Sequence, residues 1–274
     1  MENKGLTSTP GEKGMAEQPL ILVTNDDGVL APGLNSLAAE LAQVGRVVVV
    51  APDRDCSAAS HSLTMQRPLR VKELGHDIFS VDGTPTDCVI LAVGKILAAT
   101  PVLVVSGINP GPNLCDDISY SGTVSAAIEG TMLGIPSFAV SLACEDPCEY
   151  DLAASFAART ARMILAQGLP PDTLLNVNVP PGEAAEISGI KFTRQGRRRY
   201  EGSIKETNDP WGRGHFWIGG GTPVWGEGDD TDAQAVLAGY ISITPLHLDR
   251  TNYGALDYLS KGWADPFRNM ETGT

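Results

Sequence analysis

The stretch LILVTNDDG, at residues 20–28, indicates the class of fold that this chain adopts. Its first four residues form a short, continuous apolar run, which is typical of a β-strand buried on both faces of a sheet. The stretch then places two adjacent carboxylates, Asp26 and Asp27, before a glycine. Apolar side chains recur at positions 34, 37, 38 and 41, the spacing of an amphipathic helix. A buried strand, a polar loop and a helix are therefore predicted in succession.

The same alternation continues along the chain. Further apolar runs predict strands at 47–50, 102–105, 138–142, 174–179 and 241–243. Helical patterns lie between them, at 85–97, 121–134 and 156–165. Strands that alternate with helices predict an α/β fold: a Rossmann-like, mostly parallel sheet with helices on both faces.

The chain is expected to contain one domain. Residues 1–18 lack periodicity and are predicted to be a flexible N-terminal tail, and residues 19–274 to form a single α/β domain. An extended excursion at about 194–231 has few apolar runs but several aromatic residues. It is predicted to be a C-terminal hairpin or arm whose aromatic side chains are buried by a partner subunit, so that the arm is used in oligomerisation.

Composition excludes several classes of partner. The chain has 20 Lys and Arg against 33 Asp and Glu, a net charge of −13, which argues against binding a nucleic acid polymer or an anionic membrane. The most apolar stretch, residues 89–105, is too interrupted to span a membrane. Five cysteines without a CxxC pair, and a tail without an apolar segment, predict a soluble, cytoplasmic protein with free thiols.

Polar side chains gather in three loops that a parallel sheet brings to one edge. Right-handed crossovers place the loops after successive parallel strands at that edge, where ligands of open α/β sheets bind. These loops are residues 25–33, 51–62 and 106–123. In the first of them, Asp26 and Asp27 repel each other unless a cation or a shared proton relieves the repulsion. The alternative is an ordinary turn, since Asn, Asp and Gly also favour turns.

A cation at this edge would be a hard one. The chain has only four histidines, with no HExxH motif and no paired cysteines, so a zinc site is poorly supported. Carboxylates suit Mg²⁺ or Mn²⁺, and Ser57 and Asn109 in the neighbouring loops offer further oxygen ligands. Residues 121–123, Ser-Gly-Thr at a predicted helix start, could bind a phosphate group or could simply cap the helix.

Motifs of several competing enzyme classes are missing from the sequence. There is no Walker GxxxxGK[ST], no GxSxG and no Cys-x5-Arg loop. Residues 53–57 resemble the DxDx[TV] signature of aspartyl-phosphate phosphatases only loosely, because Pro52 interrupts the preceding strand and the fifth position is a serine.

Five sequence blocks in order resemble the survival protein SurE family of nucleotidases. They are Asn25-Asp26-Asp27-Gly28 with Ala31-Pro32-Gly33, Ala51-Pro52-Asp53-Arg54 leading to Ser57, Gly83-Thr84-Pro85-Thr86-Asp87-Cys88, Ser106-Gly107-Ile108-Asn109 with Gly111-Pro112-Asn113, and Tyr120-Ser121-Gly122-Thr123. The resemblance runs from about residue 21 to residue 142 and resumes at 176–180 and 243–246. Cys115, where a small residue is usual in the family, and Cys56 depart from its pattern.

The resemblance implies a metal-dependent phosphomonoesterase that hydrolyses nucleoside 5′- and 3′-monophosphates. It implies one divalent cation per subunit and a homodimer or homotetramer assembled through the arm. The metal ligands that it implies are Asp26, Asp27, Ser57 and Asn109. The phosphate contacts that it implies are Asn113, Ser121, Gly122 and Thr123. The proposed chemistry is direct in-line attack by a water placed by Asp26 or Asp27, without a phospho-aspartate.

Two other functions stay open from the sequence: a broader phosphatase or exopolyphosphatase, and a nucleotide-binding sensor without turnover. Several charged groups are expected to be structural rather than catalytic. Asp87 is predicted to stabilise a helix start. Asp116 and Asp117 are interpreted as solvated loop charges with a supporting site role as the alternative, and residues 197–199, three arginines, as a solvated or salt-bridged face or else a cationic rim that attracts anionic substrates.

Overall fold

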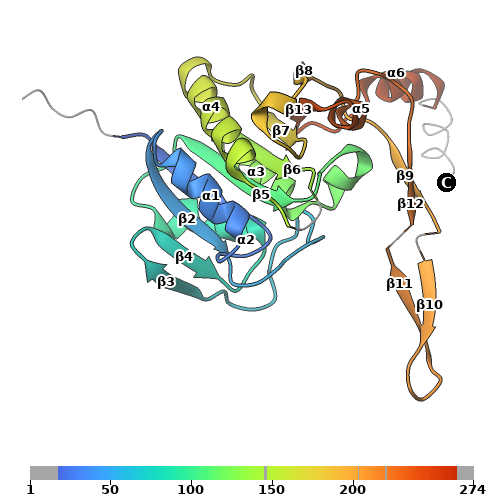
Figure 1. Ribbon diagram of the computed structural model, residues 1–274, viewed down its shortest axis with the longest axis horizontal. Helices are drawn as coiled ribbons and strands as arrows, with labels where there is room; N and C mark the ends of the chain where they lie inside the picture. Colours follow the sequence, from blue (N-terminus) through green and yellow to red (C-terminus); the bar gives the residue numbers. More distant parts are fainter. Residues whose placement is uncertain (1–17, 145–146, 203, 220, 264–274) are drawn as a thin grey trace, which may run out of the picture.

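The apolar run at the start of the fold forms strand β1 (Leu20–Thr24), which lies inside a nine-stranded sheet in the computed structural model (Figure 1). The structure describes residues 18–144, 147–202, 204–219 and 221–263. Strand β1 pairs in parallel with β2 (Arg46–Pro52) on one side and with β5 (Leu103–Pro110) on the other. Residues 21–24 are completely buried, as the apolar run predicts for a central strand.

The sheet is mostly parallel, with the strand order β3-β4-β2-β1-β5-β6-β7-β13-β8. The remaining strands are β3 (Val71–Gly75), β4 (Ile78–Val81), β6 (Ser137–Leu142), β7 (Thr173–Val179), β8 (Gly189–Phe192) and β13 (Tyr240–His247). Only the β3–β4 and β7–β13 pairs of this sheet are antiparallel. The carboxyl ends of β2, β1, β5 and β6 therefore meet at one edge, and the predicted fold class is confirmed.

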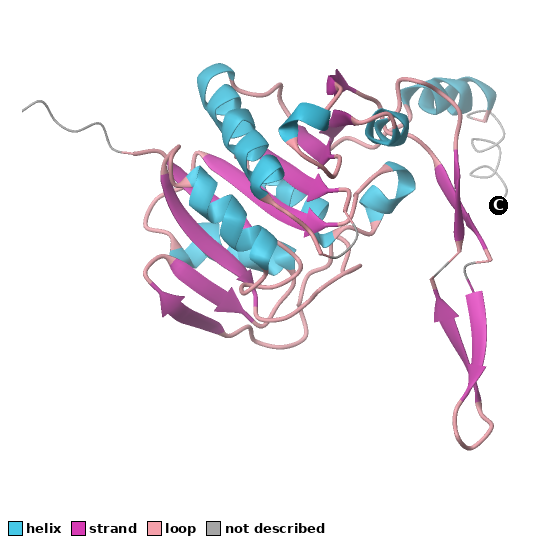
Figure 2. Ribbon diagram, in the orientation of Figure 1, coloured by secondary structure: helices cyan, strands magenta, loops and turns pink. Residues whose placement is uncertain are grey.

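Helices cover both faces of the sheet (Figure 2). The helices are α1 (Pro32–Leu41), α2 (Pro85–Leu91), α3 (Gly122–Met132), α4 (Asp151–Gln167), α5 (Asp232–Leu237) and α6 (Tyr253–Gly262). A π-helical turn, η1 (Ala92–Ile96), continues α2, and two 3₁₀ turns are η2 (Cys115–Ser119) and η3 (Ala184–Glu186). Helices α1 and α4 pack together over one apolar cluster, and α2 and α3 cover a second one on the other face.

Helices α2 and α3 begin at side-chain caps. In α2, the Thr84 hydroxyl accepts a hydrogen bond from the backbone N–H of Asp87 at 3.1 Å, and the Asp87 carboxylate accepts one from the N–H of Thr84 at 2.9 Å. This reciprocal capping box confirms Asp87 as a stabiliser of the helix start. In α3, the Ser121 hydroxyl accepts from the N–H of Val124 at 3.1 Å.

The arm predicted at about 194–231 contains two successive antiparallel ladders. Strand β9 (Arg198–Glu201) pairs with β12 (Thr222–Trp225), and β10 (Ile204–Asn208) pairs with β11 (Gly214–Ile218). In Figure 1 these hairpin ladders project away from the sheet and its helices. The predicted tail, residues 1–18, lies outside the described residues except for its last position. The prediction of one domain over 19–274 stays a prediction.

Several features of the described structure were not foreseen. Strand β3 has mostly exposed side chains and lacks the apolar alternation of a strand, and helix α6 has no buried residue. The predicted helix over 85–97 changes to a π-helical turn after residue 91. Within the residues that the structure describes, no helix is long and apolar enough to cross a membrane.

The expectation of five free thiols is wrong for one pair. Cys144 and Cys148 form a disulfide, because the turn between β6 and α4 brings their Cα atoms to 5.8 Å from each other, within the span of a disulfide. Residues 145 and 146, between them, lie outside the described residues. Cys56, Cys88 and Cys115 are free, as expected.

The cap of α2 generates a prediction on stability. Replacing Thr84 by alanine removes the acceptor for the Asp87 N–H and the donor to the Ser62 carbonyl, so we expect the free energy of unfolding to fall by about 1 kcal/mol. Urea denaturation followed by circular dichroism measures it. Thr84→Ser keeps the hydroxyl and should retain most of the stability; an equal loss in both variants would contradict the role of the cap.

Candidate active site

The first loop makes its turn without using the two carboxylates. The Asn25 side chain donates to the carbonyl of Gly28 at 3.0 Å, and the N–H of Gly28 donates back to the Asn25 side-chain oxygen at 3.3 Å. Gly28 has a φ of +104°, a conformation that favours glycine. Asn25 and Gly28 therefore form the turn, and the carboxylates of Asp26 and Asp27 are left free for other partners.

Asp26 lies against the start of helix α3. Its carboxylate is 4% exposed and accepts a hydrogen bond from the Thr123 hydroxyl. A Cβ atom added at Gly122 would lie 2.7 Å from the Cβ of Asp26, so glycine at this position allows the close approach. Burial raises the pKa of the Asp26 carboxyl, and the Thr123 hydrogen bond counteracts part of that rise.

Asp27 has an unsatisfied oxygen beside this carboxylate. Its Oδ2 atom is buried and has no hydrogen-bond partner among the described residues. Burial, the charge of Asp26 and then the charge of Asp55 raise the pKa of Asp27 to about 7. A buried and a partly buried carboxylate of like charge, one of them with an unpaired oxygen, are an arrangement that a cation stabilises.

The second loop, which contains Ser57, is hydrogen-bonded to the first loop. The backbone N–H of Cys56 donates to the carbonyl of Asp26 at 2.8 Å, which ties this loop to the first one. The Asp55 carboxylate then accepts from both the N–H of Ser57, at 2.7 Å, and its hydroxyl, at 2.6 Å. Sequence reasoning missed Asp55, although an aspartate two residues before a serine favours this local turn.

The third loop contributes Asn109 at the end of β5. Its side-chain nitrogen donates to the carbonyl of Gly111 at 2.7 Å, which turns the Oδ1 atom toward the Thr123 hydroxyl, 3.3 Å away. The Thr123 hydroxyl thus lies between the carboxylate of Asp26 and the amide oxygen of Asn109. Within the described ranges, no group of three or more His, Cys, Asp or Glu side chains could hold a metal. A cation at this edge would therefore need neutral oxygens besides the two carboxylates.

Asn113 is held by the strands on the far side of the loop. Its backbone N–H donates to the Asn178 side chain at 2.9 Å, and its side-chain nitrogen donates to the Ser141 hydroxyl at 2.9 Å. The Asn113 carbonyl accepts from the side chains of Asn176, at 2.8 Å, and Asn178, at 3.0 Å. Sequence reasoning missed these supporting residues, although alternate positions of a buried strand point to one face.

The acidic pair at the start of η2 is hydrogen-bonded to the arm: Asp116 is exposed, as interpreted, whereas Asp117 is partly buried in an ion pair. Asp116 accepts from the backbone N–H of Arg198 at 2.8 Å, and Asp117 pairs with the Arg198 guanidinium at 2.7 Å. The arginine side chain is only 14% exposed, because it packs within the arm. This correction follows from a contact between positions more than eighty residues apart in the sequence, which no local pattern reveals.

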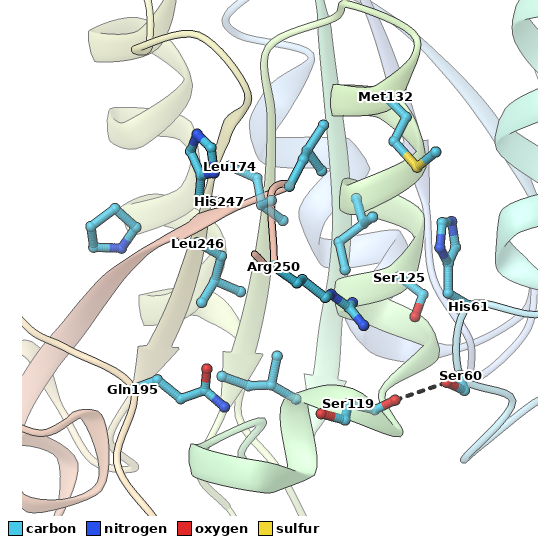
Figure 3. Close-up of a pocket in the computed structure, with 14 residues that line it drawn as sticks. Ser60, His61, Ser119, Ser125, Met132, Leu174, Gln195, Leu246, His247 and Arg250 are labelled. Atoms are coloured by element: carbon cyan, nitrogen blue, oxygen red, sulfur yellow. Dashed lines mark hydrogen bonds between the residues drawn. The ribbon is translucent and has the colours of Figure 1, made fainter. Parts of the chain in front are cut away.

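The cavity with a volume of about 810 Å³ lies along helix α3, and neither Asp26 nor Asp27 lines it. Figure 3 shows Ser60 and Ser119 on its wall, where the Ser60 hydroxyl donates to the Ser119 carbonyl at 2.8 Å. His61 also lines the cavity and contacts Glu129 at 2.8 Å. The hydrogen bond between Ser60 and Ser119 therefore joins the second loop to the segment before α3 at the wall of the cavity.

Comparisons with known proteins place this chain in one family. The sequence model of the family described as survival protein SurE matches residues 21–202. The chain is 57% identical over 240 residues to the 5'-nucleotidase SurE of Geobacter sulfurreducens, covering 87% of this chain and 92% of that protein, and 54% identical to the one of Geobacter metallireducens, covering 89% and 96%. The crystal structure of the SurE protein from Aquifex aeolicus superposes with a TM-score of 0.79 at 45% identity, covering 89% of this chain and 99% of that one. The chain belongs to the survival protein SurE family.

Proposed function

We propose that this protein is a 5′-nucleotidase, which hydrolyses nucleoside 5′-monophosphates to a nucleoside and phosphate. The observation that carries the proposal is the buried, unpaired oxygen of Asp27. Its neighbour Asp26 is buried against the start of helix α3. The names of the Geobacter relatives support the same activity. A helix start binds phosphate through its free N–H groups, and adjacent carboxylates supply oxygens for a cation and a base for water.

The residues present fit one hard divalent cation per subunit, Mg²⁺ or Mn²⁺. We propose Asp26, Asp27, Ser57 and Asn109 as its ligands, because they present carboxylate, hydroxyl and amide oxygens at one sheet edge. When bound, such a cation would supply Lewis-acid polarisation of the phosphate group. The proximity of the like-charged Asp26 and Asp27 carboxylates, which contributes to the raised pKa of Asp27, supports this assignment.

The chain's own residues would bind and orient the ester. The N–H groups at the start of α3, with the hydroxyl groups of Ser121 and Thr123, would hold the phosphate oxygens, and Asn113 would complete this seat. Asp26 is engaged by Thr123, whereas Asp27 has a free oxygen. We therefore propose that Asp27 Oδ2 acts as the general base and accepts a proton from the attacking water. The new P–O bond forms as the ester P–O bond breaks, and the nucleoside oxygen takes a proton from solvent.

The wider substrate range is a further part of the proposal. We include nucleoside 3′-monophosphates, and we keep a broader phosphatase or exopolyphosphatase activity and a non-hydrolysing nucleotide sensor as alternatives. Phosphate release from a nucleoside 5′-monophosphate, a 3′-monophosphate and polyphosphate, each with and without added Mn²⁺, distinguishes the three. Release from none of them would leave only the sensor.

We also propose that the arm joins this chain to a second copy in a homodimer or homotetramer. Phe216, Trp217 and Ile218 are 68%, 68% and 89% exposed on β11, a large apolar surface for a strand in a two-stranded ladder. Such surface is characteristic of contacts between proteins. A second copy presents the same surface, which a symmetric contact would bury against itself.

Two further proposals concern the chain as a whole. We infer that residues 19–274 act as one domain, because the large sheet takes strands from Leu20 to His247. We infer a cytoplasmic location, which the three free cysteines support and the Cys144–Cys148 disulfide does not. Fractionation of cells tests the location.

Asp27→Asn should abolish catalysis. We expect kcat to fall by about 100-fold or more, because the variant loses both the base and a cation ligand. Phosphate release in the presence of Mn²⁺ measures it. Asp53→Asn is the matched control, since Asp53 lies in the neighbouring loop and its side chain pairs with the exposed Arg54. Equal activity of Asp27→Asn and the wild type would refute the assignment.

Gly122→Ala tests the close packing of α3 on Asp26. The added methyl group would force the helix start or the carboxylate to move, and we expect kcat/KM to fall by about 100-fold. Gly94→Ala is the control, because no atom lies within 4 Å of its added Cβ. If both variants keep full activity, the contact between Gly122 and Asp26 does not matter for catalysis.

Trp217→Glu tests the assembly. A charge on the exposed arm surface should prevent the contact between copies, so the mass measured by light scattering after gel filtration should drop to that of a smaller species. Met163→Glu, on the 57% exposed position of helix α4, should leave the mass unchanged. An unchanged mass in Trp217→Glu would show that the arm does not carry the assembly.

A further inference from the structure

The segment between the candidate phosphate residues, residues 114–120, joins Asn113 to the N-cap Ser121. It contains the 3₁₀ turn η2 and no regular helix or strand. The body of the protein holds this segment at its two ends. Asn113 bonds to Asn178 of β7, and the Ser119 carbonyl accepts from the Ser60 hydroxyl. The middle of the segment, residues 115–117, faces neither of these supports.

The root of the arm supplies the missing support. We define the arm root as β9 and β12, the ladder nearest the body (Figure 1). The backbone N–H of Arg198 donates to Asp116 at 2.8 Å, its guanidinium donates to Asp117 at 2.7 Å, and the Tyr200 hydroxyl donates to Asp117 at 2.8 Å. Three hydrogen bonds thus connect two residues of β9 with two consecutive residues of η2.

Asp232, at the start of α5, ties the first residue of the turn to the same region. Its carboxylate is completely buried and accepts from the N–H of Cys115 at 2.8 Å and from the N–H of Gly196 at 2.9 Å. The side chain of Gln195 donates to the Cys115 carbonyl at 2.8 Å. Cys115 has a φ of 55°, which is uncommon for a residue other than glycine and persists only where the surroundings hold it.

The Arg198–Asp117 pair is not an ordinary surface ion pair. The guanidinium of Arg198 lies between two rings, 4.4 Å from the centroid of Tyr200 and 4.6 Å from that of Trp225. Its Nε atom is buried and has no partner in the part of the chain that the structure describes. A cation so removed from water depends on its carboxylate, because losing the partner leaves an uncompensated charge. Losing either partner should therefore destabilise the contact between the arm and η2.

We propose that the arm root positions the phosphate-binding residues of the active site, with Asp117, Arg198 and Asp232 as positioning residues. The inference rests on the proposed nucleotidase function. These residues would hold η2 so that Asn113 and the start of α3 stay at a fixed separation across the bound phosphate. None of the three belongs to the proposed cation ligands, which lie in the loops after β1 and β2 and at the end of β5. Loosening the arm root should weaken phosphate binding and leave cation binding unaffected.

The test compares two properties of the same full-length variants, Asp117→Asn, Arg198→Gln and the double substitution. KM and kcat for a nucleoside 5′-monophosphate and the inhibition constant of inorganic phosphate are measured at saturating Mn²⁺, and the Mn²⁺ concentration for half-maximal activity is measured separately. We expect KM and the phosphate inhibition constant to rise together by about fivefold or more, with kcat and the Mn²⁺ requirement unchanged. The double variant should show the same rise in both constants as each single variant, because each single substitution already removes the same contact.

Two further variants separate positioning from general damage. Tyr200→Phe removes only one hydrogen bond to Asp117 and keeps the ring over Arg198, so it should fold and show a smaller rise in KM. Arg213→Gln removes the Arg213–Asp209 ion pair beyond the arm root, with the same charge change as Arg198→Gln, and should leave every constant unchanged.

The outcomes distinguish this inference from the proposed function. An active wild type with unchanged KM in Asp117→Asn and Arg198→Gln would overturn the inference alone. An equal rise in Arg213→Gln, or in Trp217→Glu, would also overturn it, because disturbance of the arm or of the assembly would then suffice. If the wild type releases no phosphate, the proposed function fails. Calorimetric titration of inorganic phosphate in the presence of Mn²⁺ then tests the inference, which requires weaker binding in Asp117→Asn.

Discussion

The contact of Asp26 with the first turn of helix α3 is the constraint on which the rest of the site depends. Thr123 donates to the carboxylate, and Gly122 lets the helix approach it without a side chain between them. Because β1 and β5 are parallel neighbours, the same threonine also reaches Asn109 at the end of β5. One hydroxyl group thus fixes the relative positions of an acidic loop, an amide oxygen and a helix start. The proposed phosphate seat and the proposed cation site adjoin each other at that hydroxyl.

The sequence predicts this meeting point because the rule that produces it is topological. Parallel strands bring the loops after β1, β2 and β5 to one edge whatever the details of their side chains, and the apolar runs identify the strands. The turn at residues 25–28 illustrates where prediction from the sequence stops. Asn and Gly could be recognised as turn residues, but that they form the turn between themselves and leave both carboxylates free is a property of the folded loop.

Contacts between distant residues account for what the sequence did not reveal. Asp117 has the appearance of a solvated loop residue until Arg198 is placed over it between two aromatic rings. Cys144 and Cys148 show no spacing that distinguishes a disulfide from two thiols, and only the turn after β6 brings their Cα atoms together. Strand β3 at the edge of the sheet has exposed side chains, so the pairing with β4 defines it rather than an apolar pattern.

The charge of the site explains why its parts have to occur together. None of the eight residues proposed for cation or phosphate binding is cationic, the chain carries a net charge of −13, and the phosphate group is itself an anion. Nor is Arg198 free to attract the substrate, since Asp117 and the two rings hold it. The helix start offers only about half a positive charge, which is too little to hold a phosphate dianion beside two carboxylates. A divalent cation held by the two carboxylates would offset their charge, and a helix start held in place by its neighbours would then bind the phosphate oxygens.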